Sequence, residues 1–458
     1  MKHWSKTMLL AHRIRLDPDA AQRDYFARAA GTARRVWNWG LAEWLRQRDA
    51  GGKPNAMALK KQFNAIKYVH PDWCDEDGKP WLRMMHRDSG SRGFGRCTAR
   101  LRTDLPLQGQ VPKGDSHAQP FAHLGRAWSR YYEQLKAKLP AHQPRFKKKG
   151  RCPDSFYVAN DKFRLQGMSI VLPKIGGVAL RETLRLDGKI MGATVQREAD
   201  NWYVSVQVEL AAGAAMRLRT GDGVTGVDLG ISAAATLSTG EAIASPRPLK
   251  AALRRLRIRS RRASRKFEAA KAAAGIRGAI PKGTRLPVSK NRTKGAQSLA
   301  RLHARIAAVR SDFTHKLTTR LCRENQTVVI EDLHVRGMLA NGRLSRSLSD
   351  IGFGRIRTQL EYKALRYGTH LMVADRWYAS SKLCSGCGVK YATLALNERT
   401  WTCSQCGAQH DRDHNAAINL QRLAAGAADT CSGNALPVAS RTVTSGTASG
   451  ACQMEAGK

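Results

Sequence analysis

Residues 226–230 of the chain read Gly226-Val-Asp-Leu-Gly230, and this short stretch decides what kind of fold surrounds it. The glycines and apolar residues predict a strand, yet an aspartate, Asp228, interrupts it. A carboxylate inside such a strand is costly to bury unless a cation neutralises it. The stretch therefore predicts an acid-bearing α/β region in which Asp228 has a task other than packing.

Two further acids stand at comparable positions. Glu331 ends an apolar strand that begins at Thr327, and Asp413 begins a small apolar helix that continues to Leu420. Three carboxylates brought together repel one another without a metal, and with one they make a hard oxygen site for Mg²⁺ or Mn²⁺. Two such ions, about 4 Å apart, activate water and stabilise the leaving oxygen in phosphodiester hydrolysis.

These acids have ordinary interpretations as well. Each one alone is compatible with a helix cap or a surface carboxylate, and Asp413 with the favourable acid of a helix N-terminus. Asp332 adjoins Glu331, and strand alternation sends the two side chains to opposite faces. The same ambiguity holds for Asp411 and Asp413. The residues alone leave open which acid of each pair faces the site.

The ten cysteines include one cluster with metal-ligand spacing. Cys384 and Cys387 form one Cys-x2-Cys pair, fifteen residues follow, and Cys403 and Cys406 form the second pair. This spacing is typical of a zinc ribbon, in which four thiolates close a structural site. His410 is a less favoured substitute ligand, because four thiolates already complete a tetrahedron. The remaining cysteines are expected to be free thiols in a reducing compartment: Cys74, Cys97, Cys152, Cys322, Cys431 and Cys452.

The chain is strongly basic. Its 458 residues include 78 Lys and Arg against 36 Asp and Glu, a net charge of +42. A 42% apolar share is enough for a core, so the charge indicates an anionic partner rather than disorder. No apolar run approaches the ~18–20 residues that span a bilayer. Met8–Ala11 is too short for a secretory signal, so we expect a cytoplasmic protein. Basic residues recur from Arg13 to Arg422, which favours nucleic acid over a membrane surface.

Two basic segments are candidates for phosphate contact. Between Lys250 and Lys266, nine of 17 residues are Lys or Arg, and no acid interrupts them. A solvated helix normally mixes both signs, so we expect this helix and the basic turn at 145–149 to bind phosphates. The candidate residues are Arg145, Lys147, Lys148, Lys149, Arg254, Arg255, Arg261 and Arg262. Three tryptophans at helical spacing are predicted to pack in a core rather than stack on bases: Trp37, Trp39 and Trp128.

Periodicity divides the chain into regions. Residues 8–16 predict a strand, helices follow, and short alternating runs between 156 and 209 predict an antiparallel β unit that the first strand joins. Residues 70–119 show no sustained period. Residues 272–295 are expected to form a flexible insertion. The predicted boundaries are 1–18 and 140–215 for the β unit, 19–139 for the helical insertion, 222–376 and 408–423 for the acid-bearing region, 377–407 for the ribbon and 424–458 for a disordered tail.

The order of these motifs resembles the TnpB (OrfB) family of insertion-sequence proteins. Its specific part is Gly226–Gly230, then Val329-Ile-Glu-Asp-Leu333, the four cysteines, and Asp411-Arg-Asp-His-Asn-Ala-Ala-Ile-Asn-Leu420. Further matches are Trp377-Tyr-Ala-Ser-Ser-Lys382, Arg35-Val-Trp-Asn38, Pro144-Arg-Phe-Lys147 and Trp202-Tyr-Val-Ser205. The resemblance covers about residues 8–423. The long segment 272–295, the long tail and the run Ala233-Ala-Ala235 depart from the family pattern.

The resemblance implies an RNA-guided DNA endonuclease that cuts with Mg²⁺. It implies a RuvC nuclease of RNase H fold, with the zinc ribbon inserted before its last helix. An N-terminal antiparallel β-barrel, the wedge, would carry the helical recognition insertion. By motif position the RuvC acids would be Asp228, Glu331 and Asp413. The implied partners are a guide RNA from the end of the element and double-stranded target DNA, in a prokaryotic cytoplasm and with a monomer favoured. Base pairing would read sequence while the protein holds the heteroduplex by its phosphates.

Three alternatives remain open at this point. A compact type V CRISPR effector uses the same RuvC acids, and the neighbouring locus would distinguish it. A guided DNA-binding repressor that does not cut is a second alternative, although all three acids are present. A transposase that joins strands itself is disfavoured, because no tyrosine nucleophile accompanies a His-hydrophobe-His metal motif.

Overall fold

The computed structural model describes residues 7–66 and 115–429, apart from 174, 212, 214–215, 282–283, 285, 392–393 and 396–397. The described residues divide at residue 212 into two compact units. The expectations for residues 67–114 and for the tail beyond 429 lie outside this part of the chain, as do Cys74, Cys97, Cys431 and Cys452. No helix in the described part is long and apolar enough to cross a membrane.

The first unit is built on a seven-stranded antiparallel sheet, with strand order β2-β6-β7-β1-β5-β4-β3. The strands are β1 (Thr7–Asp17), β2 (Ser155–Ala159), β3 (Arg164–Gln166), β4 (Ser169–Leu172), β5 (Gly176–Leu180), β6 (Lys189–Glu198) and β7 (Asn201–Ala211). Strand β1 pairs with β7, far away in sequence, in a register that places Ile14 opposite Val204. The prediction that the first strand joins the β unit is therefore confirmed.

The predicted barrel is not confirmed. Strands β2 and β3 end the order on either side, and they do not pair with each other in the described residues, so the sheet is not closed. Closure depends on how the two edges meet in space, and alternation along each strand carries no information about that. The unit is an open antiparallel sheet with helices.

The helices of this unit are α1 (Ala20–Asp49), α2 (Ala56–Ile66) and α4 (Asp115–Lys136), with the short 3-10 helix η2 (Asn160–Lys162) between β2 and β3. Asp19 caps α1 in a capping box with Gln22. Phe26 of α1 packs between Phe156 and Trp202 of the sheet, at centroid distances of 5.7 and 5.1 Å. A separate core joins α1, α2 and α4 and includes three of the predicted core tryptophans: Trp37, Trp39 and Trp128.

The second unit contains a five-stranded mixed sheet of order β10-β9-β8-β11-β12. Its strands are β8 (Gly223–Asp228), β9 (Ala235–Leu237), β10 (Ala242–Ile243), β11 (Asn325–Glu331) and β12 (His370–Ala374). Strands β10, β9 and β8 run antiparallel, whereas β8, β11 and β12 are parallel. This is an α/β architecture, as the acid-bearing strand predicts.

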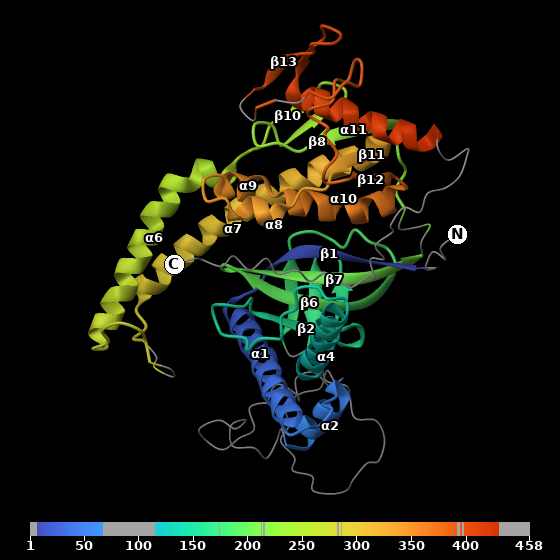
Figure 1. Ribbon diagram of the computed structural model, residues 1–458. Helices are drawn as coiled ribbons and strands as arrows, with labels where there is room; N and C mark the ends of the chain where they lie inside the picture. The colour runs from blue at the N-terminus through green and yellow to red at the C-terminus, as the bar shows by residue number, and fades with distance from the viewer. Residues whose placement is uncertain are drawn as a thin grey trace, which may run out of the picture. The chain divides into compact units, whose positions relative to one another are not determined.

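Helices cover both faces of this sheet, α7 and α10 on one and α11 on the other (Figure 1). The helices are α6 (Pro248–Ala273), α7 (Lys290–Glu324), α8 (Val335–Ala340), α9 (Ser345–Ile351), α10 (Phe353–Tyr367) and α11 (Arg412–Asp429). Because α6 reaches residue 273 and α7 starts at 290, the expected insertion at 272–295 is shorter than predicted. Between β12 and α11 lies a small hairpin of β13 (Thr400–Thr402) and β14 (Gln409–Asp411).

A buried carboxylate fixes the basic helix α6 to the rest of this unit. Asp350, 3% exposed, accepts hydrogen bonds from the amides of Leu249 and Lys250 in the first turn of α6. It also pairs with Arg310 of α7 at 3.2 Å. A carboxylate is favourable at a helix N-terminus, where amides lack internal partners. Apolar side chains of α6 and α7 then pack along their length, with Leu256 among those buried.

The contact of α11 with β8 depends on a glycine. A β-carbon at Gly226 would lie 1.9 Å from the carbonyl oxygen of Ala417 and 2.5 Å from the amide nitrogen of Gln421. Both atoms belong to the backbone of α11 and cannot move aside as a flexible side chain would. Ala417 and Leu420 are buried beneath the helix. A residue without a β-carbon is therefore required where the helix crosses the strand.

We predict that Gly226→Ala destabilises this unit by at least about 2 kcal/mol, because the added carbon overpacks a backbone contact. For a unit of this size the melting temperature should fall by roughly 4–8 °C, measured by calorimetry. Gly223→Ala is the matched control, since it lies on the same strand and its added carbon would have no neighbour within 4 Å. Equal melting temperatures of the two variants would contradict the role of Gly226.

Candidate metal centres

Asp228 and Glu331 lie together at one edge of the sheet. Strands β8 and β11 are parallel neighbours with Val227 opposite Ile330, so the acid that follows each of these residues reaches the same carboxyl edge. Asp228 is partly buried there. Burial, together with the negative charges of Glu331 and Asp413, raises the pKa of Asp228 to about 8.

Helix α11 brings the third acid to this edge. A β-carbon at Gly230 would lie 4.0 Å from Oδ2 of Asp228 and also 4.0 Å from Oδ2 of Asp413. These two oxygens are therefore no more than 8 Å apart. The structure thus gathers three sequence-predicted acids, from two strands and one helix, at one place.

The neighbouring acids, Asp332 and Asp411, are held by other partners. Asp332 forms ion pairs with Arg357 and with Arg376, the second at 2.6 Å. Asp411 accepts a hydrogen bond of 2.9 Å from the amide of His414 and thereby caps α11. Each of these two acids has a structural partner of its own, and neither contributes to the raised pKa of Asp228.

Three polar side chains that the sequence did not single out support the acids. The Ser380 hydroxyl donates a hydrogen bond to Glu331. The Ser232 hydroxyl donates to Asp413 at 3.2 Å, and the Arg399 guanidinium lies 3.3 Å from the same carboxylate. Ser380 belongs to the motif before the first cysteine pair, which is a usable signal. Nothing in the local pattern marks Ser232 or Arg399, because their partner is distant in sequence.

The chemistry of this acid group fits a hard divalent cation. All of its donors are carboxylate oxygens, which are the ligands that Mg²⁺ prefers. Burial and the charges of Glu331 and Asp413 raise the pKa of Asp228 to about 8, which is the effect expected where three carboxylates meet without a compensating cation. The carboxylate oxygens of the three acids are more widely spaced than the sulfur atoms of the cysteine cluster. Among the described residues, the four cysteines are the group whose possible ligand atoms all lie within 4.8 Å of one another.

The four predicted cysteines converge on one point. All four sulfur atoms lie within 4.8 Å of one another, and both Cys384–Cys406 and Cys387–Cys403 are 3.6 Å apart. A Zn–S bond of about 2.3 Å gives a tetrahedral sulfur–sulfur distance of about 3.8 Å, so the cluster has the size that zinc requires.

His410 lies beside this cluster rather than within it. Its Nε2 is 3.0 Å from Sγ of Cys384, and its ring packs against Trp401 with centroids 4.7 Å apart. It is not one of the side chains gathered within 4.8 Å. A histidine in this position orients a thiolate by hydrogen bonding, which is the usual work of a residue behind a metal ligand.

Two buried asparagines of α11 bind the backbone of the first cysteine pair. Asn415 accepts from the amide of Ser385 at 2.9 Å and donates to the carbonyl of Leu383 at 2.7 Å. Asn419, one turn later, donates to the same carbonyl at 2.7 Å and to that of Ser380 at 2.8 Å. The helix that carries Asp413 therefore also holds the cysteine ribbon. Their i, i+4 spacing in an apolar helix was the signal that sequence reasoning missed.

The basic residues predicted to contact phosphates differ in how exposed their side chains are. In the turn at 145–149, Arg145, Lys148 and Lys149 are exposed. The side chain of Lys147 packs on α1 instead. Its ammonium lies 4.0 Å from the centre of the Trp37 ring, and burial lowers the pKa of Lys147. On α6 the four candidate arginines are exposed and are not among the side chains that pack on α7: Arg254, Arg255, Arg261 and Arg262.

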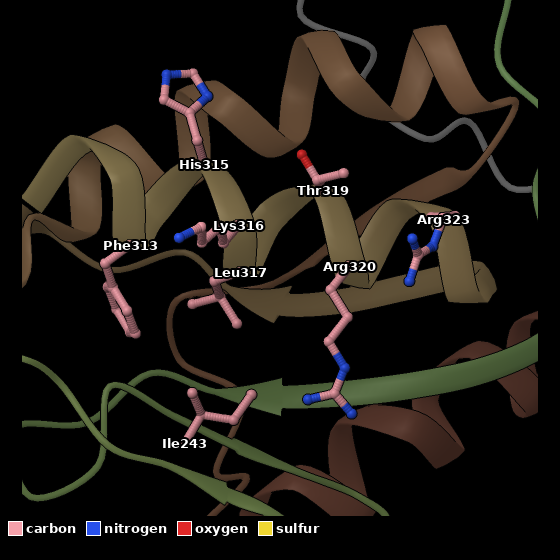
Figure 2. Close-up of a pocket in the computed structure, with 8 residues that line it drawn as sticks. All are labelled: Ile243, Phe313, His315, Lys316, Leu317, Thr319, Arg320 and Arg323. Carbon is pink, nitrogen blue, oxygen red and sulfur yellow. The ribbon is translucent and has the colours of Figure 1, made fainter.

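A pocket of about 540 Å³ on α7 is not an anion site, although basic residues surround it (Figure 2). Phe313 and Leu317 of α7 and Ile243 of β10 form its apolar lining. Its charged rim is paired: Arg320 makes two 2.7 Å contacts with Glu241, and Lys316 lies 2.8 Å from Asp312. The pocket contains none of the three site acids.

Comparison with known families matches three segments of the chain. Residues 204–342 match a family described as "Probable transposase", and residues 353–420 match the "Cas12f1-like, TNB domain". Residues 8–53 match a family described as "Helix-turn-helix domain". In this structure those residues form strand β1 and the single long helix α1 rather than two helices.

Two curated proteins are similar over most of their length. A protein of Streptomyces pristinaespiralis named "Putative RNA-guided DNA endonuclease" is 35% identical over 83% of this chain and 88% of its own. InsQ of Escherichia coli K12, which carries the same description, is 27% identical over 91% and 92%. Among solved structures, the Cas12f1 complex with guide RNA and target DNA aligns at a TM-score of 0.48 and 11% identity, over 91% of this chain and 99% of that one. On its motifs and these relatives, the chain belongs to the TnpB (OrfB) family.

Proposed function

We propose that this protein is an RNA-guided, Mg²⁺-dependent DNA endonuclease of the TnpB type. The observation that carries the proposal is the convergence of Asp228, Glu331 and Asp413 at one edge of the α/β sheet. The names of the relatives agree with it, because they describe RNA-guided DNA endonucleases over nearly the same length of chain. We assign these three acids as the RuvC catalytic residues.

The acids would hold the catalytic Mg²⁺, which supplies water activation and leaving-group stabilisation in phosphodiester hydrolysis. Asp228 would have to give up its proton to serve as a ligand, because burial and the other two carboxylates raise its pKa to about 8. Ser380 orients Glu331, and Ser232 orients Asp413. Arg399 offsets part of the charge of Asp413.

The four cysteines would hold a structural Zn²⁺. A closed four-thiolate site has no open position for a substrate, so this zinc stabilises the ribbon and does no chemistry. The ribbon at 377–407 is an insertion within the nuclease, which we assign to 222–376 and 408–423. The β unit and its helical insertion, at 1–18, 140–215 and 19–139, would bind the guide RNA and the target DNA.

The partners follow from charge and family. A net charge of +42 suits a guide RNA and double-stranded DNA held by their phosphates. The exposed arginines of α6 and the exposed residues of the turn at 145–149 are the proposed contacts. Lys147 is the weakest of these candidates, because its side chain packs on Trp37. We place the protein in the prokaryotic cytoplasm as a monomer.

A guided protein that binds without cutting is the second candidate function. The specific observation against it is that all three acids are present and gathered at one place. A type V CRISPR effector would use the same acids, and the neighbouring locus distinguishes it: a CRISPR array or the end of an insertion sequence.

Asp228→Ala is expected to abolish cutting of guided target DNA and to spare binding, because it removes a metal ligand and leaves the basic surfaces intact. Cleavage products on a gel and target affinity by filter binding measure the two effects. The control is Asp411→Asn, which keeps a capping side chain on α11 and should cut at about the wild-type rate. Wild-type cutting by Asp228→Ala would refute the nuclease site.

The raised pKa of Asp228 predicts that the free energy of unfolding depends on pH. A carboxyl whose pKa is raised on folding binds its proton more tightly in the folded state, so stability falls as pH rises towards 8. Asp228→Asn does not titrate. Without Mg²⁺ it should therefore melt roughly 5 °C or more above the wild type at pH 8.5, with little difference at or below about pH 4. Added Mg²⁺ should raise the melting temperature of the wild type more than that of Asp228→Asn. A pH-independent difference would contradict the burial of Asp228 among acids.

Cys403→Ser should reduce bound zinc from about one ion per chain to nearly none, measured by atomic emission. The ribbon and the start of α11 should loosen, so cleavage is lost as well, although no catalytic acid is changed. The free cysteine Cys152 offers a matched control, because Cys152→Ser should keep both zinc and cleavage. A Cys403→Ser protein with full zinc content would rule out the four-thiolate site.

A further inference from the structure

One aromatic side chain beside the nuclease centre has no packing role. Trp377 is 86% exposed, whereas Trp37, Trp44, Trp128, Trp202 and Trp401 are between 1% and 7% exposed. The neighbouring Asp375 and Arg376 are charged and also exposed. A surface that binds another protein normally presents several apolar side chains together, so a lone ring between charges does not match that pattern.

The loop that presents this ring is held in place. The amide of Trp377 donates to Oδ1 of Asp375 at 2.8 Å. Arg376 pairs with Asp332 at 2.6 Å, and the hydroxyl of Tyr378 donates to the carbonyl of Asn419 in α11 at 3.2 Å. The residues on either side of Trp377 are therefore tied to the sheet and to α11. The ring's exposure is built into the fold.

The loop also adjoins the carboxylates. Strand β12 ends at Ala374, which pairs with Glu331 in the parallel register. Arg376 contacts Asp332, and Ser380 contacts Glu331. Trp377 lies between these two contacts. Its Cα lies at most about 11 Å from that of Ser380, because three residues span no more than this.

We propose that Trp377 stacks on an unpaired base of the DNA strand being cut, next to the phosphodiester bound by the carboxylates. This inference rests on the proposed function. Both faces of a base inside a duplex are already covered, so a ring that is free on its surface selects single-stranded DNA. Every base has an aromatic face, which makes the contact independent of sequence. The stacked base would fix the register of the strand over Asp228, Glu331 and Asp413.

The binding test uses single-stranded DNA carrying 2-aminopurine, whose fluorescence is quenched when it stacks on tryptophan. The full-length protein without Mg²⁺ should quench it, and Trp377→Leu should abolish most of that quenching. Trp377→Phe keeps an aromatic face and should retain a substantial part of it. The control is Leu365→Ala, which removes another exposed apolar side chain and should quench as the wild type does. Equal quenching by wild type and Trp377→Leu overturns the proposal.

The cutting test separates this proposal from the nuclease assignment. Losing one stacked base should slow guided cleavage by about 5- to 100-fold in Trp377→Leu, with Trp377→Phe intermediate. An abasic site at the stacked position should slow the wild type similarly and add nothing in Trp377→Leu. If the wild type never cuts but its quenching still depends on Trp377, the nuclease assignment is refuted and the stacking proposal stands. If Trp377→Leu quenches and cuts as the wild type does, the stacking proposal alone is refuted.

Discussion

The close approach of α11 to β8 at Gly226 is the constraint on which the nuclease unit depends. The backbone of α11 leaves no room for a β-carbon at position 226. This contact sets the height and angle of α11 over the sheet, and so determines where its first turn places Asp413 relative to Asp228. Two short strands and one helix, distant in sequence, become one site because a single residue lacks a side chain.

The same helix connects the two metal centres. Asp413 belongs to the carboxylate group, and Asn415 and Asn419 hold the backbone of the first cysteine pair. Ser380 lies between the centres and contacts both Glu331 and Asn419. A structural zinc and a catalytic cation would thus be coupled through one helix and one loop, although they bind to chemically different ligands.

The sequence predicted the parts whose chemistry is unusual where they stand. A carboxylate in an apolar strand and a doubled Cys-x2-Cys pattern are visible locally, and the structure brings the three acids together and the four thiols together. Asp332 is held by Arg376 and Asp411 by the cap of α11, and no local pattern in the sequence predicts those partners. The barrel was not confirmed, because closure is a property of sheet edges. Ser232 and Arg399 were missed, because each touches a carboxylate far away in the chain.

The ribbon and the catalytic helix share an uninterrupted backbone. Strand β14 ends at Asp411, and α11 begins at Arg412 with no residue between them. A designer who wanted a smaller protein would see the ribbon as a removable insertion, yet there is no linker to absorb a change in its length. Any shortened or exchanged ribbon must deliver the chain to Arg412 in the same direction, or the carboxylate on the next residue will be misplaced.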